Sequence, residues 1–121
     1  FGQFAQEPLN LFETIFNTSI IAALEGEALH NYGKEALVSL VDHFESLFTK
    51  QEVKNIVKEY KDLKYHMKAL KRLDPKLTDF RLFFSILKDK YTLKLKNAAL
   101  LIELMFCVSH LLQWWKDLFL P

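Results

Sequence analysis

The stretch KNAALLIELMFCVSHLLQWW, residues 96–115, is the most apolar part of this 121-residue chain, and its placement decides the fold. Its apolar length lies at the lower limit for crossing a bilayer. Glu103, Ser109, His110 and Gln113 lie within it, and one central acid alone costs a few kcal/mol on membrane insertion. We therefore expect a core helix over about 96–118, and a membrane-associated helical protein is our third hypothesis.

The composition favours long helices. Half of the residues are apolar and eleven are Phe, whereas Gly and Pro number three each. Few turn formers argue against many short strands. Cys107 is the single cysteine, which excludes an intrachain disulfide. The prediction is an all-α, single-domain bundle of about five helices over residues 1–121, with a very apolar final helix.

Helical periodicity predicts four further helices upstream of the opening stretch. Pro8 lies near the first turn of the first one, and Thr49 and Glu52 have the spacing of a capping box at the start of the third. Thr78 or Asp79 can cap the fourth. The predicted helices cover about 8–24, 34–48 and 49–72, and a segment that begins near residue 78.

The fourth predicted helix has four apolar side chains on its expected inner face. These are Phe80, Phe83, Phe84 and Leu87. YTLKLK, residues 91–96, alternates apolar and polar side chains as a strand does, but no second strand is available to pair with it. We therefore expect a linker, or the first turn of the final helix, at 91–96.

Charge is distributed unevenly along the chain. Residues 1–49 carry a net charge of −6 and residues 50–96 a net charge of +8. Four lysines of the predicted third helix recur at helical spacing, and a face of this kind could bind phosphates of nucleic acid. These are Lys54, Lys58, Lys61 and Lys68. The favoured alternative is a solvated face, with Glu59 paired to nearby lysines and the acidic first third as an internal partner.

One triplet in the final helix could carry chemistry. Glu103, Cys107 and His110 fall on one helical face, where a thiolate could lie beside a base. No second cysteine and no HExxH or CxxC motif accompanies them. A buried cysteine is most often a small apolar residue. We expect no catalytic residue, no metal, no cofactor and no small-molecule substrate.

Four motifs follow one another between residues 30 and 109. The first is YGKE at 32–35, which leads into a helix with HF near its end. The second has the form V-x-E-Y-x-x-L-K, and the third, at the end of the phenylalanine-rich segment, has the form K-x-K-Y. The fourth has the form N-x-x-x-L-I-E-L. Their residues are Val57, Glu59, Tyr60, Leu63 and Lys64; Lys88, Lys90 and Tyr91; and Asn97, Leu101, Ile102, Glu103 and Leu104.

In order and spacing this region resembles the C-terminal helical region of hAT-superfamily transposases and of the zinc-finger proteins domesticated from them. The family continues into an S-x-A-x-x-E-R motif that supplies a catalytic carboxylate. Here Val108-Ser109 is followed instead by a divergent aromatic tail, residues 110–121. The resemblance implies scaffold in a nuclear, DNA-related setting. The missing carboxylates imply that two-metal phosphoryl transfer is lost.

The aromatic tail is the candidate interaction surface. Its residues are Trp114, Trp115, Leu118 and Phe119. They could anchor a partner or cap the core as the chain ends. The leading hypothesis is a non-catalytic transposase-derived module for protein interaction or self-association, with a homodimer or another protein as partner. Non-specific nucleic-acid binding is the alternative. FGQFAQEPLN is no signal peptide, so we expect the nucleus or cytoplasm rather than secretion.

Overall fold

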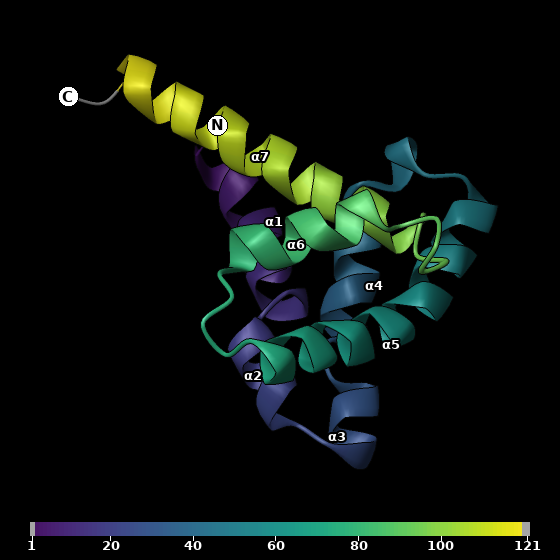
Figure 1. The fold of residues 1–121 in the computed structure, drawn as a ribbon. Coiled ribbons are helices and arrows are strands. Elements are labelled where there is room, and N and C mark those ends of the chain that lie inside the picture. Colours follow the sequence, from purple (N-terminus) through teal and green to yellow (C-terminus); the bar gives the residue numbers. More distant parts are fainter. Residues whose placement is uncertain (1, 120–121) are drawn as a thin grey trace.

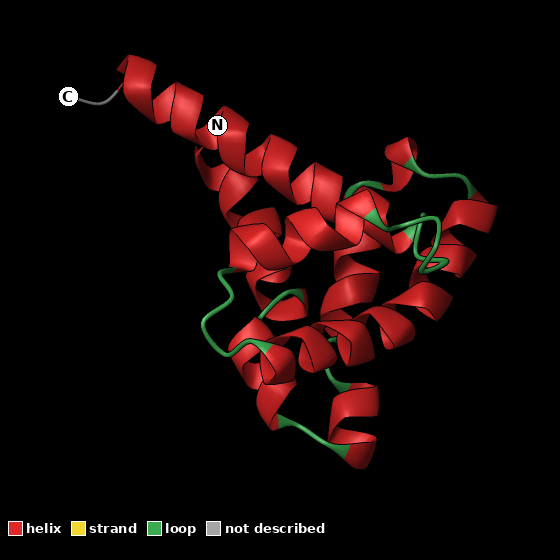
Figure 2. Ribbon diagram, viewed as in Figure 1, coloured by secondary structure: helices red, strands yellow, loops and turns green. Residues whose placement is uncertain are grey.

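The protein is all-α in the computed structural model, which describes residues 2–119 except for the side chains of residues 2–6, 112, 115 and 119. Within this range there are helices and connecting loops and no strand (Figure 2). Five helices have ten residues or more: α1 (Gly2–Ile15), α4 (Lys34–His43), α5 (Lys50–Leu73), α6 (Asp79–Lys88) and α7 (Ala98–Phe119). Shorter elements are α2 (Thr18–Ala23), α3 (Gly26–Asn31) and the 3₁₀ helix η1 (Glu45–Leu47). The predicted all-α bundle with an apolar final helix is confirmed.

Side-chain caps fix where the later helices begin. The Thr49 hydroxyl accepts a hydrogen bond from the Glu52 backbone N–H (3.1 Å), and the Glu52 carboxylate accepts one from the Thr49 N–H (2.9 Å). The predicted capping box is therefore confirmed. At α6 the cap is Thr78 rather than Asp79, because the Thr78 hydroxyl accepts from the Arg81 N–H (3.3 Å).

Three predicted boundaries near the N-terminus were wrong. The segment 8–24 forms two helices, because the backbone of Asn17 is extended and its side chain accepts a hydrogen bond from the Ile20 N–H (3.1 Å), which starts α2. Pro8 lies inside α1 rather than in its first turn, since a proline removes only one helical hydrogen bond. The helix predicted over 34–48 ends at His43 and is followed by η1.

The helices enclose one core; in the view of Figure 1, α7 runs above α6, and α5 crosses below them. The long helix α5 packs against α2, α4 and α7, and α1 packs against α4 and α7. Fully buried side chains come from every α-helix; among the largest are Phe12, Ile21, Leu29, Leu40, Met67 and Leu82. The first turns of α7, residues 98–102, add Ala98, Ala99, Leu101 and Ile102 to this core.

The inner face of α6 differs from the predicted one. Leu82, Phe83 and Ile86 are buried, whereas Phe80 and Phe84 are 66% and 58% exposed. Phe80 and Phe84 stack on each other on the outer face, with ring centroids 6.2 Å apart. Residues 89–97 then form turns without a strand, which confirms the predicted linker.

Candidate interaction surface

The start of α7 is fixed by an acidic side chain from another helix. Glu59, on α5, accepts hydrogen bonds from the backbone N–H groups of Asn97 (2.9 Å) and Ala98 (3.0 Å) and from the Asn97 side-chain amide (2.7 Å). A carboxylate at this position satisfies the free N–H groups and complements the helix dipole. Glu59 therefore caps α7 and does not pair with the lysines of its own helix as predicted.

The three residues that could have carried chemistry lie on α7 without forming a reactive cluster. The Glu103 carboxylate accepts a bond from Lys90 Nζ (3.0 Å), and this contact raises the pKa of Lys90. Cys107 is exposed and not buried as predicted, because α7 leaves the body of the molecule at this point. His110 is exposed as well. Among the described residues no group of His, Cys, Asp and Glu side chains could hold a metal ion.

The second half of α7 projects beyond the other helices, toward the upper left of Figure 1. On it, four exposed side chains recur at intervals of four, three and four residues. We name them the α7 seam: Cys107, Leu111, Trp114 and Leu118. Leu111, Trp114 and Leu118 are 52%, 56% and 57% exposed. The spacing is that of one face of a helix that pairs with another helix.

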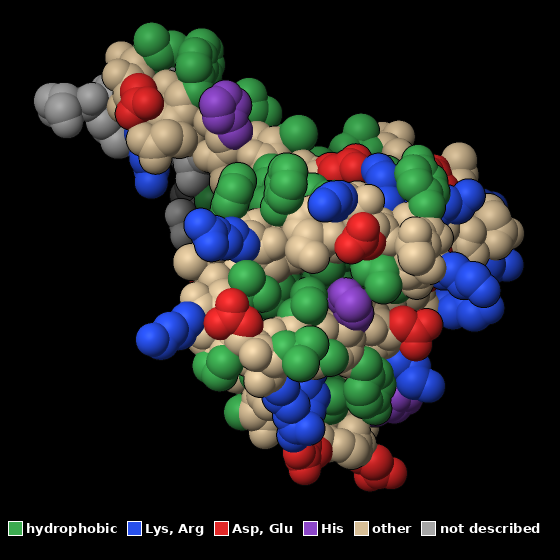
Figure 3. Space-filling model, viewed as in Figure 1, with side chains coloured by type: hydrophobic (Ala, Val, Ile, Leu, Met, Phe, Trp, Pro, Cys, Tyr) green, Lys and Arg blue, Asp and Glu red, His purple; other side chains and the backbone are tan. Residues whose placement is uncertain are grey.

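Another face of the projecting half carries polar side chains. Ser109, His110, Gln113, Lys116 and Asp117 are exposed away from the seam, and Gln113 donates to the Asp117 carboxylate (2.8 Å). Figure 3 shows hydrophobic side chains along the outer edge of this projection. Residues 107–118 thus form an amphipathic helix whose apolar face has no partner among the described residues.

Length and composition also make α7 the one described helix that could cross a membrane, over residues 98–118. Only a quarter of this window is buried in the molecule. Core helices of water-soluble proteins can have the same length and composition. The polar face described above would also be costly in lipid.

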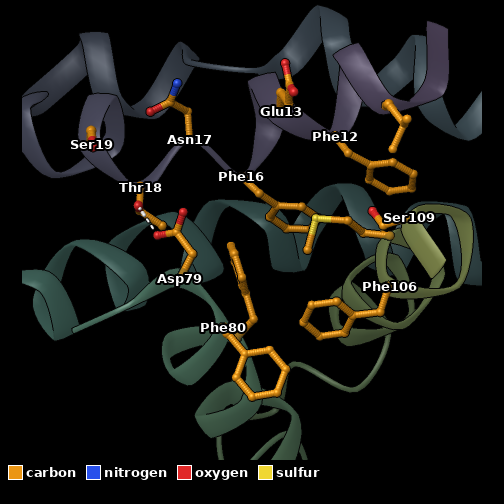
Figure 4. Close-up of a pocket in the computed structure, with 13 residues that line it drawn as sticks. Phe12, Glu13, Phe16, Asn17, Thr18, Ser19, Asp79, Phe80, Phe106 and Ser109 are labelled. Carbon is orange, nitrogen blue, oxygen red and sulfur yellow. Dashed lines mark hydrogen bonds between the residues drawn. The ribbon is translucent and has the colours of Figure 1, made fainter. Parts of the chain in front are cut away.

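An aromatic cleft of about 540 Å³ lies at the base of the projection, between α1, α2, α6 and α7. In Figure 4, Phe16 of the turn after α1, Phe80 of α6 and Phe106 of α7 approach one another across it. Phe80 and Phe106 have ring centroids 6.0 Å apart. At one end the Thr18 hydroxyl donates to the Asp79 carboxylate (2.7 Å), which joins α2 to α6. The α7 side chains that line the cleft, Met105, Phe106 and Ser109, are not those of the seam.

The predicted tail residues and three of the predicted lysines are exposed wherever the structure describes their side chains. Trp114 and Leu118 are exposed and do not cap the core, whereas the side chains of Trp115 and Phe119 lie outside the described part of the chain. Three of the four predicted lysines, Lys54, Lys58 and Lys61, are exposed along α5.

The fourth, Lys68, does not share that exposed face. Lys68 is buried, and its ammonium donates to the carbonyls of Ala22 (3.0 Å) and Leu24 at the end of α2. A lysine near the last carbonyls of a helix satisfies them and complements the dipole. Glu25 lies 3.8 Å from this ammonium and accepts a bond from Arg72 (2.7 Å). The prediction that Lys68 contacts phosphate was therefore wrong.

Lys64 acts in the same way on α3. Its ammonium is fully buried and donates to the carbonyls of Leu29 (2.7 Å), His30 (2.8 Å) and Tyr32 (2.8 Å). It also lies 4.9 Å from the centroid of the Tyr60 ring, a cation–π contact. Burial, followed by the charge of Lys34, lowers the pKa of Lys64 to about 8.

The residues of the sequence motifs contact one another in space. Glu59 of the second motif binds Asn97 of the fourth, and Lys90 of the third binds Glu103 of the fourth. Lys64 of the second motif donates to the carbonyl of Tyr32 in the first, and the Tyr60 ring of the second motif lies against Gly33 of the first. The motif residues therefore hold the helices together, and none of these contacts forms a reactive site.

Sequence reasoning identified Trp114 and Leu118 but missed Cys107 and Leu111. The interval of four, three and four residues was the available signal, and the exposed position of Cys107 depends on where α7 leaves the core. The comparisons add no further constraint: no family model matches the chain, and no curated protein or solved structure is significantly similar to it.

Proposed function

We propose that this chain is a non-catalytic helical interaction module that pairs with a second copy of itself through the α7 seam. The observation that carries this proposal is the projecting half of α7, on which Leu111, Trp114 and Leu118 are more than half exposed, while the first turns of the helix are anchored in the core. A helix held in this way needs no ordering on binding, so little conformational entropy opposes association.

The charge of the projection favours a protein partner over a lipid or a nucleic acid. Between residues 107 and 119 the charged side chains are Lys116 and Asp117, which cancel. Helices that lie on membranes are usually rich in Lys and Arg on the polar face, and nucleic-acid contacts need cations too.

A second copy is the partner that matches the seam itself. The seam bears no charged side chain, so two copies would meet without repulsion. Its alternating intervals suit pairing of like helices about a two-fold axis. The projecting residues span roughly 20 Å, enough for nearly two heptads.

The resemblance to hAT transposases supports a scaffold role. The motif residues that carry it make contacts between helices, as scaffold residues do, and the sequence lacks the family's carboxylate motif. We propose on this basis that the module derives from a transposase and acts in a nuclear, DNA-related setting without catalysis.

Light-scattering molar mass in detergent-free buffer, at low and high salt, tests the pairing. We expect a dimer once the chain concentration reaches about 100 μM. Its molar mass should not change with salt, because the seam is uncharged. Leu111→Glu should weaken it at least about 100-fold, since a two-fold interface buries the charge twice.

Lys116→Glu is the matched control, because it places the same carboxylate on the polar face of the same helix. It should leave the molar mass unchanged, and circular dichroism should show equal helicity in both variants. A wild-type chain that stays monomeric throughout would overturn self-association. Binding of the monomer to neutral lipid vesicles would instead favour the membrane hypothesis.

Non-specific nucleic-acid binding remains the second candidate, on the observation that Lys54, Lys58 and Lys61 are exposed on one face of α5. Each phosphate contact contributes about −0.9 to the slope of log affinity against log salt. Three lysines would therefore give a slope no steeper than roughly −3. All three should contribute equally if phosphates along a backbone are the ligand.

A further inference from the structure

A second pocket lies away from α7, where α3, α4 and α5 meet. It has a volume of about 390 Å³, within the range of small-molecule sites. Its walls are apolar, formed by Leu37 and Val38 of α4 and by Val57 and the Tyr60 ring of α5. Val38 and Val57 are each about half exposed, so apolar surface is left open to a ligand.

The rim of this pocket is basic. Lys34 of α4 lies on one side, and Lys58 and Lys61 of α5 lie on the other. No acidic residue is among those described around it. His30, also at the rim, responds to this positive potential, and its pKa is lowered. The largest cause is the charge of Lys34, followed by burial and by the charges of Lys61 and Lys64. Glu27 has a smaller, opposite effect.

The two kinds of lysine around the pocket have different tasks. Lys64, at its inner end, already donates all three of its protons to carbonyls and has none left for a ligand. Lys34 makes one bond, to the Asn31 side chain (3.1 Å). Lys58 and Lys61 are exposed at the mouth. The rim lysines can therefore meet an anionic group while the apolar walls contact the rest of the molecule.

We propose that this pocket binds a small amphipathic anion: an aliphatic or aromatic group bearing one carboxylate or phosphate. The anionic group lies between Lys34, Lys58 and Lys61, and the apolar group lies against Val38, Val57 and the Tyr60 ring. Neither part of the site suffices alone. Exposed lysines bind simple anions weakly in water, and the half-exposed apolar walls bury only part of a neutral apolar group. This binding is independent of the pairing of α7.

Titration calorimetry on the full chain with three probes tests the site: octanoate, octan-1-ol and inorganic phosphate. Saturable binding of octanoate is expected, with the alcohol and phosphate each at least about tenfold weaker, because each lacks one half of the ligand. Lys58→Gln with Lys61→Gln should weaken octanoate about tenfold or more. Lys54→Gln is the matched control, the same change on the same helix outside the pocket, and should have almost no effect.

A second readout follows the imidazole of His30 by NMR. Bound octanoate should raise the pKa of His30, because an anion offsets the field of Lys34, Lys61 and Lys64. Val38→Trp, which fills the pocket, should abolish both signals while leaving the circular dichroism unchanged.

Three results would overturn the proposal. Equal affinity for octanoate and octan-1-ol would show that the charges play no part. Equal losses per lysine from Lys54→Gln and from Lys58→Gln with Lys61→Gln would indicate general attraction of anions to α5, as for nucleic acid. Binding to vesicles that contain anionic lipid, without binding of free octanoate, would show that a lipid surface and not a soluble anion is recognised.

Discussion

Gly33 is the residue on which the packing of the first helices against α5 depends most directly. Its φ is +77°, a left-handed conformation that L side chains rarely adopt, and a Cβ there would collide with the hydroxyl of Tyr60. That hydroxyl is buried and donates to the Ile15 carbonyl (2.8 Å). Gly33→Ala should therefore lower the free energy of unfolding by about 3 kcal/mol, from backbone strain plus displacement of the ring.

Gly26 provides the control for this prediction. Its φ is +58°, but a Cβ at Gly26 would meet no atom within 4 Å. Gly26→Ala should cost only the strain, about 1 kcal/mol. Urea unfolding of both variants separates the two effects. Equal losses would contradict a specific contact between Gly33 and Tyr60.

Lys64 leads to a prediction about stability and pH. Lys64→Met keeps the length of the side chain but leaves three carbonyls without their donor, so we expect a loss of about 3 kcal/mol at pH 7. The wild-type pKa of about 8 lies below the unfolded value of 10.5. Between these pH values the unfolded chain holds one proton more, so the contribution of Lys64 to stability rises with pH.

The free-energy gap between wild type and Lys64→Met should thus widen from pH 8 to pH 10, as measured by urea unfolding at each pH. A gap that stays constant would show that Lys64 titrates normally in the folded protein. Measurements stop at pH 10 because burial raises the pKa of Tyr60, which adds an opposite dependence above that pH.

At the scale of the element, the anchoring of α7 rests on Glu59. Glu59→Gln keeps an acceptor for the N–H groups of Asn97 and Ala98 but removes the charge, and we expect a loss of about 1–2 kcal/mol. Asp62→Asn, the corresponding change at an exposed site of the same helix, should have an effect within about 0.5 kcal/mol. Urea unfolding measures both, and equal stability of the two variants would argue against the cap.

Elements were predictable from the sequence where local chemistry decides them. The capping box of Thr49 and Glu52 depends on residues three apart, so the start of α5 was predicted correctly. The exposed side of α6 was not predicted correctly, because Phe80 and Phe84 have the same periodicity as buried phenylalanines. Only the packing of the other helices decides which face of α6 is covered. The roles of Lys64 and Lys68 also depend on distant carbonyls, which no local pattern reveals.

Across the whole molecule, ion pairs account for only part of the contact between the acidic first third and the basic middle of the chain. Glu25 pairs with Arg72 on the surface, where an ion pair contributes about 0–1 kcal/mol. The stronger connection runs from the buried ammonium groups of Lys64 and Lys68 to backbone carbonyls. The charge pattern of the sequence indicated that the two parts dock, but not that the lysines would bind the ends of helices.

The same two lysines constrain the order in which the helices can fold. The helices α2 and α3 have six residues each, too few to persist alone in water, and their ends are satisfied by side chains that lie more than thirty residues later in the chain. During synthesis these contacts can form only after Lys64 and Lys68 have been added to the chain. We therefore expect the first third to reach its folded arrangement only once most of α5 has been made.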